Sequence, residues 1–341
     1  MRRKSSHRSL VDLARVLLAV FISMLLVSGA ISSQARRSRP PRDEDKAASA
    51  KAARRPATFG VDVNLVVLNT SVFDQGGKFV SGLRKQDFSV FEDRVEQKID
   101  SFKQEDLPVS MGILLDTSGS MKSKMEAVGK AALLLVQASN PEDEVFIITF
   151  NSEAELLEDY TSDIDDLKEA LDNITVGGGT ALFDAVQLGV EKAQKGRKLK
   201  KAIVVITDGE DKDSRYTLKQ VLDKIKESDV QVHTIGLLDP EEKRGLFEGI
   251  FNKSEREKAR GALEKLAEET GGKSVFPRQT SEVKAIVESI AHELRNQYSI
   301  GYFSSNERKD GAWRAVKVAV NGQNGGRYKV RTRSGYYAPK P

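Results

Sequence analysis

Polar side chains crowd into residues 116–120, directly after an apolar run. The stretch "GILLDTSGSM" ends that run with the carboxylate of Asp116, and the hydroxyls of Thr117, Ser118 and Ser120 follow within four residues. Such residues often cap a helix, because their side-chain oxygens accept hydrogen bonds from its first backbone N–H groups. Side-chain oxygens are also the ligands of hard cations. Taken alone, the stretch is explained by either a cap or an ion site.

Two further polar clusters lie beside predicted elements. "GGGT", which ends at Thr180, opens a predicted helix, and "TDGE", which contains Asp208, follows the apolar run "AIVVI". In an open parallel sheet, ligands bind at the carboxyl ends of the strands, where loops that are distant in the sequence meet. We therefore expect the three clusters to converge on one site.

The oxygen-rich composition of these clusters favours a hard divalent cation. Such ions take oxygen ligands, and Mg²⁺ keeps several waters in near-octahedral geometry. Ser118, Ser120 and Thr180 offer hydroxyl oxygens, while Asp116 and Asp208 supply negative charge through bound waters and hydrogen bonds. No His or Cys occurs in the clusters, which disfavours zinc. The sequence thus predicts a metal site for Mg²⁺, with Mn²⁺ or Ca²⁺ as alternatives.

The run "DGEDKD" also invites a calcium-loop interpretation. It lacks the spacing of acidic residues and glycine that an EF-hand loop requires. We therefore expect Asp208 to serve the metal site, and Glu210, Asp211 and Asp213 to form an acidic rim beside it.

Strand and helix patterns alternate between residues 107 and 295. Apolar runs such as "VSMGILLD" and "KKAIVVITDGE" predict buried strands, and "MKSKMEAVGKAALLLVQAS" carries apolar residues at helical spacing. This alternation predicts an α/β, Rossmann-like domain with a parallel-rich sheet and helices on both faces.

Short predicted strands lie on both sides of this domain, in residues 59–106 and 296–341. Alternating apolar and polar residues in "VDVNLVVLNTSVFD" and "WRAVKVAV" are typical of strands with one buried face. Neither set is expected to close a core alone. We therefore predict one small β-sandwich in two parts, with the α/β domain inserted into it.

The first 58 residues carry a targeting pattern and no core. A basic start, an apolar run from Val16 to Ile31 and small residues before Arg36 predict a secretory signal peptide over residues 1–35. An uncleaved N-terminal anchor, which would tether the protein to the membrane, is the alternative. Either predicts an exported body that is periplasmic, secreted or on the cell surface. Residues 36–58 hold no large apolar residue, so we expect a disordered basic linker.

Charge and composition exclude several classes of protein. Residues 1–58 hold thirteen Lys or Arg and four Asp or Glu, a net charge of +9, which leaves −5 for the rest of this chain of net charge +4. A mildly acidic body lacks the basic face that nucleic-acid binding requires. The sequence has no Cys, which excludes disulfides, thiolate catalysis and zinc fingers. It also lacks a Gly-x-Ser-x-Gly elbow and a P-loop.

The motifs "DTSGS", "GGGT" and "ITDGED", in this order, resemble the metal-ion-dependent adhesion site of von Willebrand factor type A domains. "VHTIGL" and "LAEETGGKSVF" are similar to late segments of that domain, so the resemblance covers about residues 107–295. The flanking stretches "LRKQDFSVFED" and "QYSIGYF" resemble bacterial exported proteins that carry a related domain.

This resemblance implies a Rossmann-like sheet with Mg²⁺ at its top face. It implies direct coordination by Ser118, Ser120 and sometimes Thr180, with Asp116 and Asp208 acting largely through water. It also implies one open coordination position, which an acidic residue of a partner completes. A cation with few direct anionic protein ligands stays electrophilic, which agrees with capture of an outside carboxylate.

Three functions are compatible with these features. The first is an exported, non-enzymatic binding or adhesion protein that captures a carboxylate of a protein partner through Mg²⁺. The second is a membrane-anchored scaffold or assembly subunit of a cell-envelope complex with a structural metal. The third, a metal-assisted hydrolase, needs a general base, and no motif places a His or spare Glu for it; we expect His233 and His292 to be structural. We take the first as the prediction.

Overall fold

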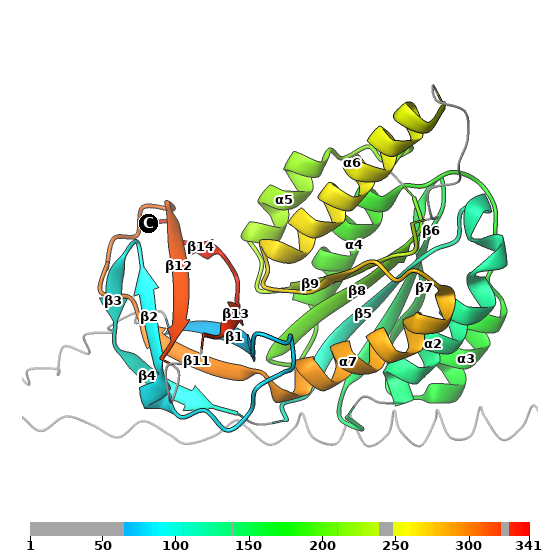
Figure 1. The fold of residues 1–341 in the computed structure, drawn as a ribbon. Coiled ribbons are helices and arrows are strands. Elements are labelled where there is room, and N and C mark those ends of the chain that lie inside the picture. The colour runs from blue at the N-terminus through cyan, green and yellow to red at the C-terminus, as the bar shows by residue number, and fades with distance from the viewer. Residues whose placement is uncertain (1–64, 105, 138–139, 210, 239–247, 322–326) are drawn as a thin grey trace, which may run out of the picture. The chain divides into compact units, whose positions relative to one another are not determined.

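The computed structural model describes most of the chain from residue 65 to its end (Figure 1). The described residues are 65–341 except 105, 138–139, 210, 239–247 and 322–326. The predicted signal segment and linker lie outside them, as does Glu210 of the predicted acidic rim. No helix in the described parts of the chain has both the length and the apolar character needed to cross a membrane.

A six-stranded sheet forms the centre of the α/β part, with strand order β10-β9-β8-β5-β6-β7 (Figure 1). Neighbouring strands from β10 to β6 run parallel. β5, β8 and β9 are buried along almost their whole length, which explains their continuous apolar runs. The strands are β5 Val109–Asp116, β6 Glu144–Phe150, β7 Ala154–Thr161, β8 Lys200–Thr207, β9 Gln231–Gly236 and β10 Ser274–Val275.

The sequence patterns do not predict strand β7, which runs antiparallel to β6 at the edge of the sheet. Its sequence, "AELLEDYT", is rich in acidic residues and has neither a continuous apolar run nor a strict alternation. An edge strand tolerates such a sequence because only one of its sides pairs with a neighbour. The sheet is therefore mixed, with a parallel centre and one antiparallel edge strand.

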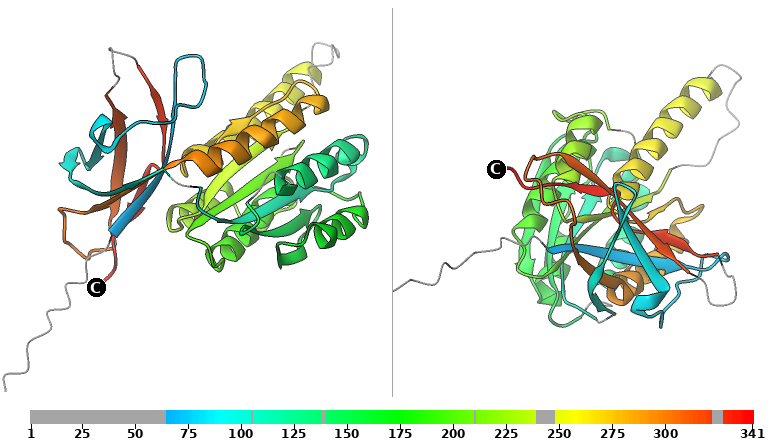
Figure 2. Two further views of the ribbon diagram at one scale, coloured as in Figure 1. Left: turned by 90° about the horizontal axis from the view of Figure 1, so that it is seen from below. Right: turned by 90° about the vertical axis from the view of Figure 1, so that its left-hand side faces the viewer.

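Helices cover both faces of this sheet (Figure 2). One hydrophobic cluster joins α2, α3 and α7 to the sheet, and a second joins α4, α5 and α6 to it. β5 contributes to both clusters: Ile113 and Leu115 belong to the first and Leu114 to the second. This is the layered α/β architecture that the alternation predicts. The helices are α2 Met125–Gln137, α3 Ile164–Asp172, α4 Leu182–Gln194, α5 Leu218–Lys226, α6 Glu248–Glu268 and α7 Val283–Asn296.

The segments before and after the α/β part together form two four-stranded antiparallel sheets, ordered β13-β1-β11-β4 and β14-β12-β2-β3. In each sheet an early strand pairs with a late one, β1 with β11 and β2 with β12. Apolar side chains of both sheets share one hydrophobic cluster. That they form a separate sandwich domain stays a prediction. The strands are β1 Leu65–Phe73, β2 Phe88–Glu92, β3 Val95–Gln97, β4 Ile99–Lys103, β11 Tyr298–Phe303, β12 Trp313–Val320, β13 Lys329–Arg331 and β14 Gly335–Tyr337.

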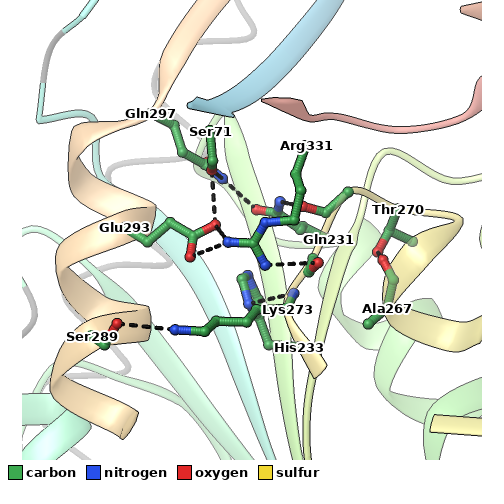
Figure 3. A network of polar contacts seen from close by, with 12 residues as sticks. Ser71, Gln231, His233, Ala267, Thr270, Lys273, Ser289, Glu293, Gln297 and Arg331 are labelled. Carbon is green, nitrogen blue, oxygen red and sulfur yellow. Dashed lines mark hydrogen bonds and ion pairs between the residues drawn. The ribbon is translucent and has the colours of Figure 1, made fainter. Parts of the chain in front are cut away.

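A polar network joins β1 and β13 to α7 and β9 (Figure 3). Arg331 Nη2 donates to both carboxylate oxygens of Glu293 at 2.6 Å, and Ser71 Oγ donates to one of them at 2.8 Å. Gln297 Nε2 donates to Ser71 Oγ at 3.1 Å and to Gln231 Oε1 at 2.9 Å. We call these five residues the Arg331 network. Since they come from the central sheet, its last helix and the flanking strands, the network connects the two parts of the described chain.

Candidate metal centre

The three polar clusters meet at one edge of the central sheet. Asp116 is the last residue of β5, and Asp208 directly follows the last residue of β8. These strands are parallel neighbours, with Leu115 paired to Ile206, so their carboxyl ends lie side by side. The "GGGT" loop is joined to the first cluster by a backbone hydrogen bond from Gly177 N–H to the Thr117 carbonyl, at 2.8 Å. The predicted convergence of the three loops is therefore present.

Asp213 holds the "GGGT" loop in place. Its Oδ2 accepts a hydrogen bond from the Thr180 N–H at 3.1 Å, and its own N–H donates to the Thr180 carbonyl. Gly179 is required by this contact, because a Cβ added there would lie 1.7 Å from Asp213 Oδ2. The next residue of the loop, Thr180, faces the "TDGE" loop, since its Oγ1 lies 3.7 Å from the position of a Cβ added at Gly209.

Both site carboxylates have protein donors on every oxygen. Asp116 Oδ1 accepts from the Ser118 N–H at 2.9 Å, and Asp116 Oδ2 accepts from the Thr207 hydroxyl at 2.6 Å. Asp208 Oδ1 accepts from the Ser120 hydroxyl at 2.8 Å, and Asp208 Oδ2 accepts from Lys124 Nζ at 2.7 Å. Neither of the two donors Thr207 and Lys124 is predicted from the sequence as part of the site.

The hydroxyl oxygens of Ser118 and Ser120 lie beside these carboxylates and can serve as direct ligands. Ser118 Oγ and Ser120 Oγ lie 3.1 Å apart. The single hydroxyl proton of Ser120 is directed to Asp208, so Ser118 donates in the contact between the two serines. Thr117 points elsewhere, because its hydroxyl donates to the Phe150 carbonyl at 3.2 Å. A pair of serine oxygens with lone pairs available thus lies beside two carboxylates.

The site is buried on one side and open on the other. Asp116 and Ser118 are buried, whereas Ser120 is exposed. Burial raises the pKa of Asp116 above its ordinary value, against hydrogen bonds from Ser118 and Thr207 that lower it. A cation bound nearby would favour the charged form of Asp116. Ions from solvent can reach the site through the exposed serine.

The donor set fits a hard divalent ion. Hydroxyl oxygens and carboxylates are ligands that Mg²⁺ and Ca²⁺ accept. Among the described residues, no group of three or more His, Cys, Asp or Glu side chains is placed to hold a metal ion, so the candidate centre consists of hydroxyls with two supporting carboxylates. The structure brings together Asp116, Ser118, Ser120 and Asp208 by direct hydrogen bonds and places Thr180 beside them. Their role as metal ligands stays a prediction.

Asp211 and Asp213, the described residues of the predicted acidic rim, accept hydrogen bonds from neighbouring loop residues and from the start of α4. Asp211 Oδ1 accepts from the Phe183 N–H at 3.0 Å, at the start of α4, and from the Ser214 hydroxyl. Asp213 holds Thr180, as described above. Of the described histidines, His233 is buried in β9 and His292 lies on α7, so neither joins the centre.

Two proteins of known sequence are similar to part of this chain. The sequence is 30% identical over 141 residues to an uncharacterized protein of Synechocystis sp., covering 39% of this chain and 33% of that protein. It is 23% identical over 234 residues to an uncharacterized protein of Borreliella burgdorferi, covering 62% of each. The chain thus spans less than two thirds of the length of these relatives.

One solved structure is similar to part of this chain at low identity. An aerotolerance-related membrane protein from Bacteroides fragilis matches with 22% identity and a TM-score of 0.42, over 55% of this chain and 98% of that one. A sequence model of the von Willebrand factor type A domain matches residues 111–294, which is more than half of the 341 residues. The chain therefore belongs to the von Willebrand factor type A domain family.

Proposed function

We propose that this protein is an exported, non-enzymatic binding protein that captures a carboxylate of a protein partner through Mg²⁺. In this proposal Ser118, Ser120 and Thr180 hold the ion through their hydroxyl oxygens. Asp116 and Asp208 hold the ion's waters and orient the serines. Membership in the von Willebrand factor type A domain family supports a role in protein–protein interaction or adhesion.

One observation carries the proposal: all four carboxylate oxygens of Asp116 and Asp208 already accept hydrogen bonds from the protein. An ion at the neighbouring hydroxyls would then have mostly neutral direct ligands. Such an ion keeps much of its positive charge and attracts an anionic oxygen from outside. Bound Mg²⁺ would therefore supply an electrophilic position for a partner's Asp or Glu.

The surroundings of the centre support binding rather than catalysis. Hydrolysis by a metal ion needs a positioned general base in addition to the ion. Each carboxylate oxygen of Asp116 and Asp208 already accepts a hydrogen bond from the protein, and the two described histidines lie on other elements. We infer that the protein is not an enzyme.

Export is the part of the proposal that rests on residues 1–35. Their basic start and apolar run favour a signal peptide, and an uncleaved anchor would place the described residues on the same side of the membrane. The partner would then be met outside the cytoplasm.

Calorimetric titration of Mg²⁺ and of Mn²⁺ into the purified protein tests the ion site. We expect saturable binding of one ion, and a loss of affinity of about 10–100-fold in Asp116→Asn, the range measured when residues supporting metal ligands are replaced. Ser118→Ala removes a direct ligand and should weaken binding at least as much. Ser123→Ala is the matched control, because Ser123 is an exposed serine in the same turn, η2 (Gly119–Ser123). Equal binding by all variants would refute the proposed ion site.

Carboxylate capture needs a separate measurement. Acetate is titrated into the Mn²⁺-loaded protein while the relaxation rate of water protons is followed. Bound Mn²⁺ increases this rate through the waters that it coordinates, and a carboxylate that displaces one of them reduces the increase. We expect a saturable decrease in the native protein. The metal would instead be structural if acetate has no effect on the bound ion and removal of the ion abolishes the far-ultraviolet circular dichroism signal of the folded protein.

A further inference from the structure

The candidate metal centre contains an ammonium group beside its two carboxylates. Lys124 follows η2, and its Nζ lies 2.7 Å from Asp208 Oδ2 and 3.2 Å from the carbonyl of Leu237. The Lys124 side chain is 11% exposed and that of Asp208 is 1% exposed. The ammonium is therefore held between the ends of β8 and β9, within the site rather than at its rim.

This lysine changes the charge that an incoming ion meets. Asp116 and Asp208 contribute two negative charges, and Lys124 contributes one positive charge. A divalent ion then leaves these groups with a net charge of +1, whereas without Lys124 they would be neutral. Because the ion pair is almost shielded from solvent, water screens these charges less than it would on an open surface.

We propose that Lys124 sets the charge balance of the centre, so that it binds the divalent ion more weakly and an outside carboxylate more tightly. This inference rests on the proposed function. The positive charge of Lys124 repels the ion and attracts the partner's carboxylate, so its two effects have opposite signs. Lys124 acts here as a positioning and specificity-determining residue.

Lys124 also stabilises the ion-free site. Without an ion, its ammonium is a donor to Asp208 and balances part of the charge that burial makes costly. Loss of the lysine should therefore lower the stability of the ion-free protein. An added ion should then restore more stability in the variant than in the native protein, because tighter binding gives a larger shift of the unfolding temperature.

A purely structural ion pair makes a different prediction. If Lys124 only braced the loop, its removal would disorder the site, and the affinity for the ion would fall or stay unchanged. A gain in ion affinity together with a loss in carboxylate affinity separates the two cases. Loss of folding alone cannot produce that pattern.

The test compares Lys124→Met and Lys124→Arg with the native protein. Lys122→Met is the matched control, since Lys122 is an exposed lysine of η2 two residues earlier. Mg²⁺ affinity is measured by calorimetry and acetate affinity by relaxation of the Mn²⁺-loaded protein. Thermal unfolding with EDTA and with Mg²⁺ checks that each variant folds.

We expect Lys124→Met to bind Mg²⁺ at least about ten-fold more tightly, the effect of removing one unit charge a few Å from a divalent ion even when water screens the charges fully. Acetate should bind it more weakly. Lys124→Arg should retain native affinities for both, because it keeps the charge, and Lys122→Met should match the native protein. Unchanged or weaker Mg²⁺ binding in a folded Lys124→Met protein would overturn the inference.

The failures of the two proposals are distinguishable. If the native protein and Lys124→Met both fail to bind an ion, both proposals fall. If only Lys124→Met binds, the inference about Lys124 stands and the proposed function of the native site falls. If the native protein binds Mg²⁺ and acetate but the lysine variants do not differ from it, only the inference about Lys124 falls.

Discussion

Replacement of Arg331 by Met should destabilise the protein strongly, because it leaves a carboxylate without its cation. The Glu293 side chain is 3% exposed and that of Arg331 is 27% exposed. Breaking a buried ion pair by removing one partner costs about 3–5 kcal/mol. Since a quarter of the Arg331 side chain meets solvent, we expect a loss of about 2–4 kcal/mol in the free energy of unfolding. Methionine retains an apolar stem for the contact with Phe73, over whose ring the Arg331 guanidinium lies at 4.4 Å.

Two optical probes can follow this change in different parts of the molecule. The chain has one tryptophan, Trp313, and it lies in β12 of the flanking sheets. The described α-helices lie in the α/β part, so circular dichroism at 222 nm reports mainly on that part. In urea, we expect the midpoint from Trp313 fluorescence and the midpoint from circular dichroism both to fall, because the Arg331 network connects the two parts.

A double-mutant cycle isolates the pair itself. Arg331→Met, Glu293→Gln and the double variant should show a coupling free energy of about 1.5–3 kcal/mol, since the two side chains share two hydrogen bonds. The exposed pair Lys284–Glu288 on α7, the helix that carries Glu293, is the control. Lys284→Met should lower the free energy of unfolding by less than about 0.5 kcal/mol. Additive single substitutions at residues 293 and 331 would refute this reasoning.

Further predictions concern two glycines and one histidine. Gly112→Ala should lower the free energy of unfolding by about 1–3 kcal/mol in urea titrations, since its Cβ would lie 2.3 Å from the Phe146 ring. Gly129→Ala, inside α2 with open space around it, should instead raise it by about 0.5–1 kcal/mol. Burial, with lesser effects of nearby cations, lowers the pKa of His233 to about 3 in the folded protein. An unfolded His takes a proton below about pH 6.5, so His233 makes stability fall by about 1.4 kcal/mol per pH unit from there toward pH 3. His233→Asn should flatten the pH dependence of the unfolding free energy between pH 6 and pH 4.

The central elements of the fold follow from local sequence patterns. "VSMGILLD" is apolar on both faces of β5, because helices cover both sides of the sheet, and such runs stand out in the sequence. β7 does not stand out, because an edge strand that is partly exposed needs no apolar run. Pairing of β1 with β11 joins residues more than 200 positions apart. No local pattern encodes that contact, although the lack of a core in each strand set indicates it.

The candidate centre is predictable to a similar degree. Parallel strands bring their carboxyl ends together, so the meeting of the Asp116 and Asp208 loops follows from the fold class. The partners of these carboxylates do not follow from it. Thr207 reaches Asp116 across 91 positions, and Lys124 reaches Asp208 across 84. Hydrogen bonds of this kind depend on side-chain directions at the ends of neighbouring strands, and sequence periodicity does not report those directions.

The Arg331 network and the candidate metal centre are both polar clusters attached to the same sheet, yet their chemistry differs. In the Arg331 network, Glu293 accepts hydrogen bonds from Arg331 and from Ser71, and its charge is matched by a guanidinium. A cluster that is satisfied and shielded in this way can stabilise the fold, but it offers little to a ligand. In the candidate metal centre each carboxylate oxygen also has a protein donor, but the serine hydroxyl oxygens keep lone pairs and Ser120 is exposed. Carboxylates held by protein donors beside neutral hydroxyl oxygens favour a bound ion that keeps much of its positive charge, and we propose that this charge attracts a partner's carboxylate.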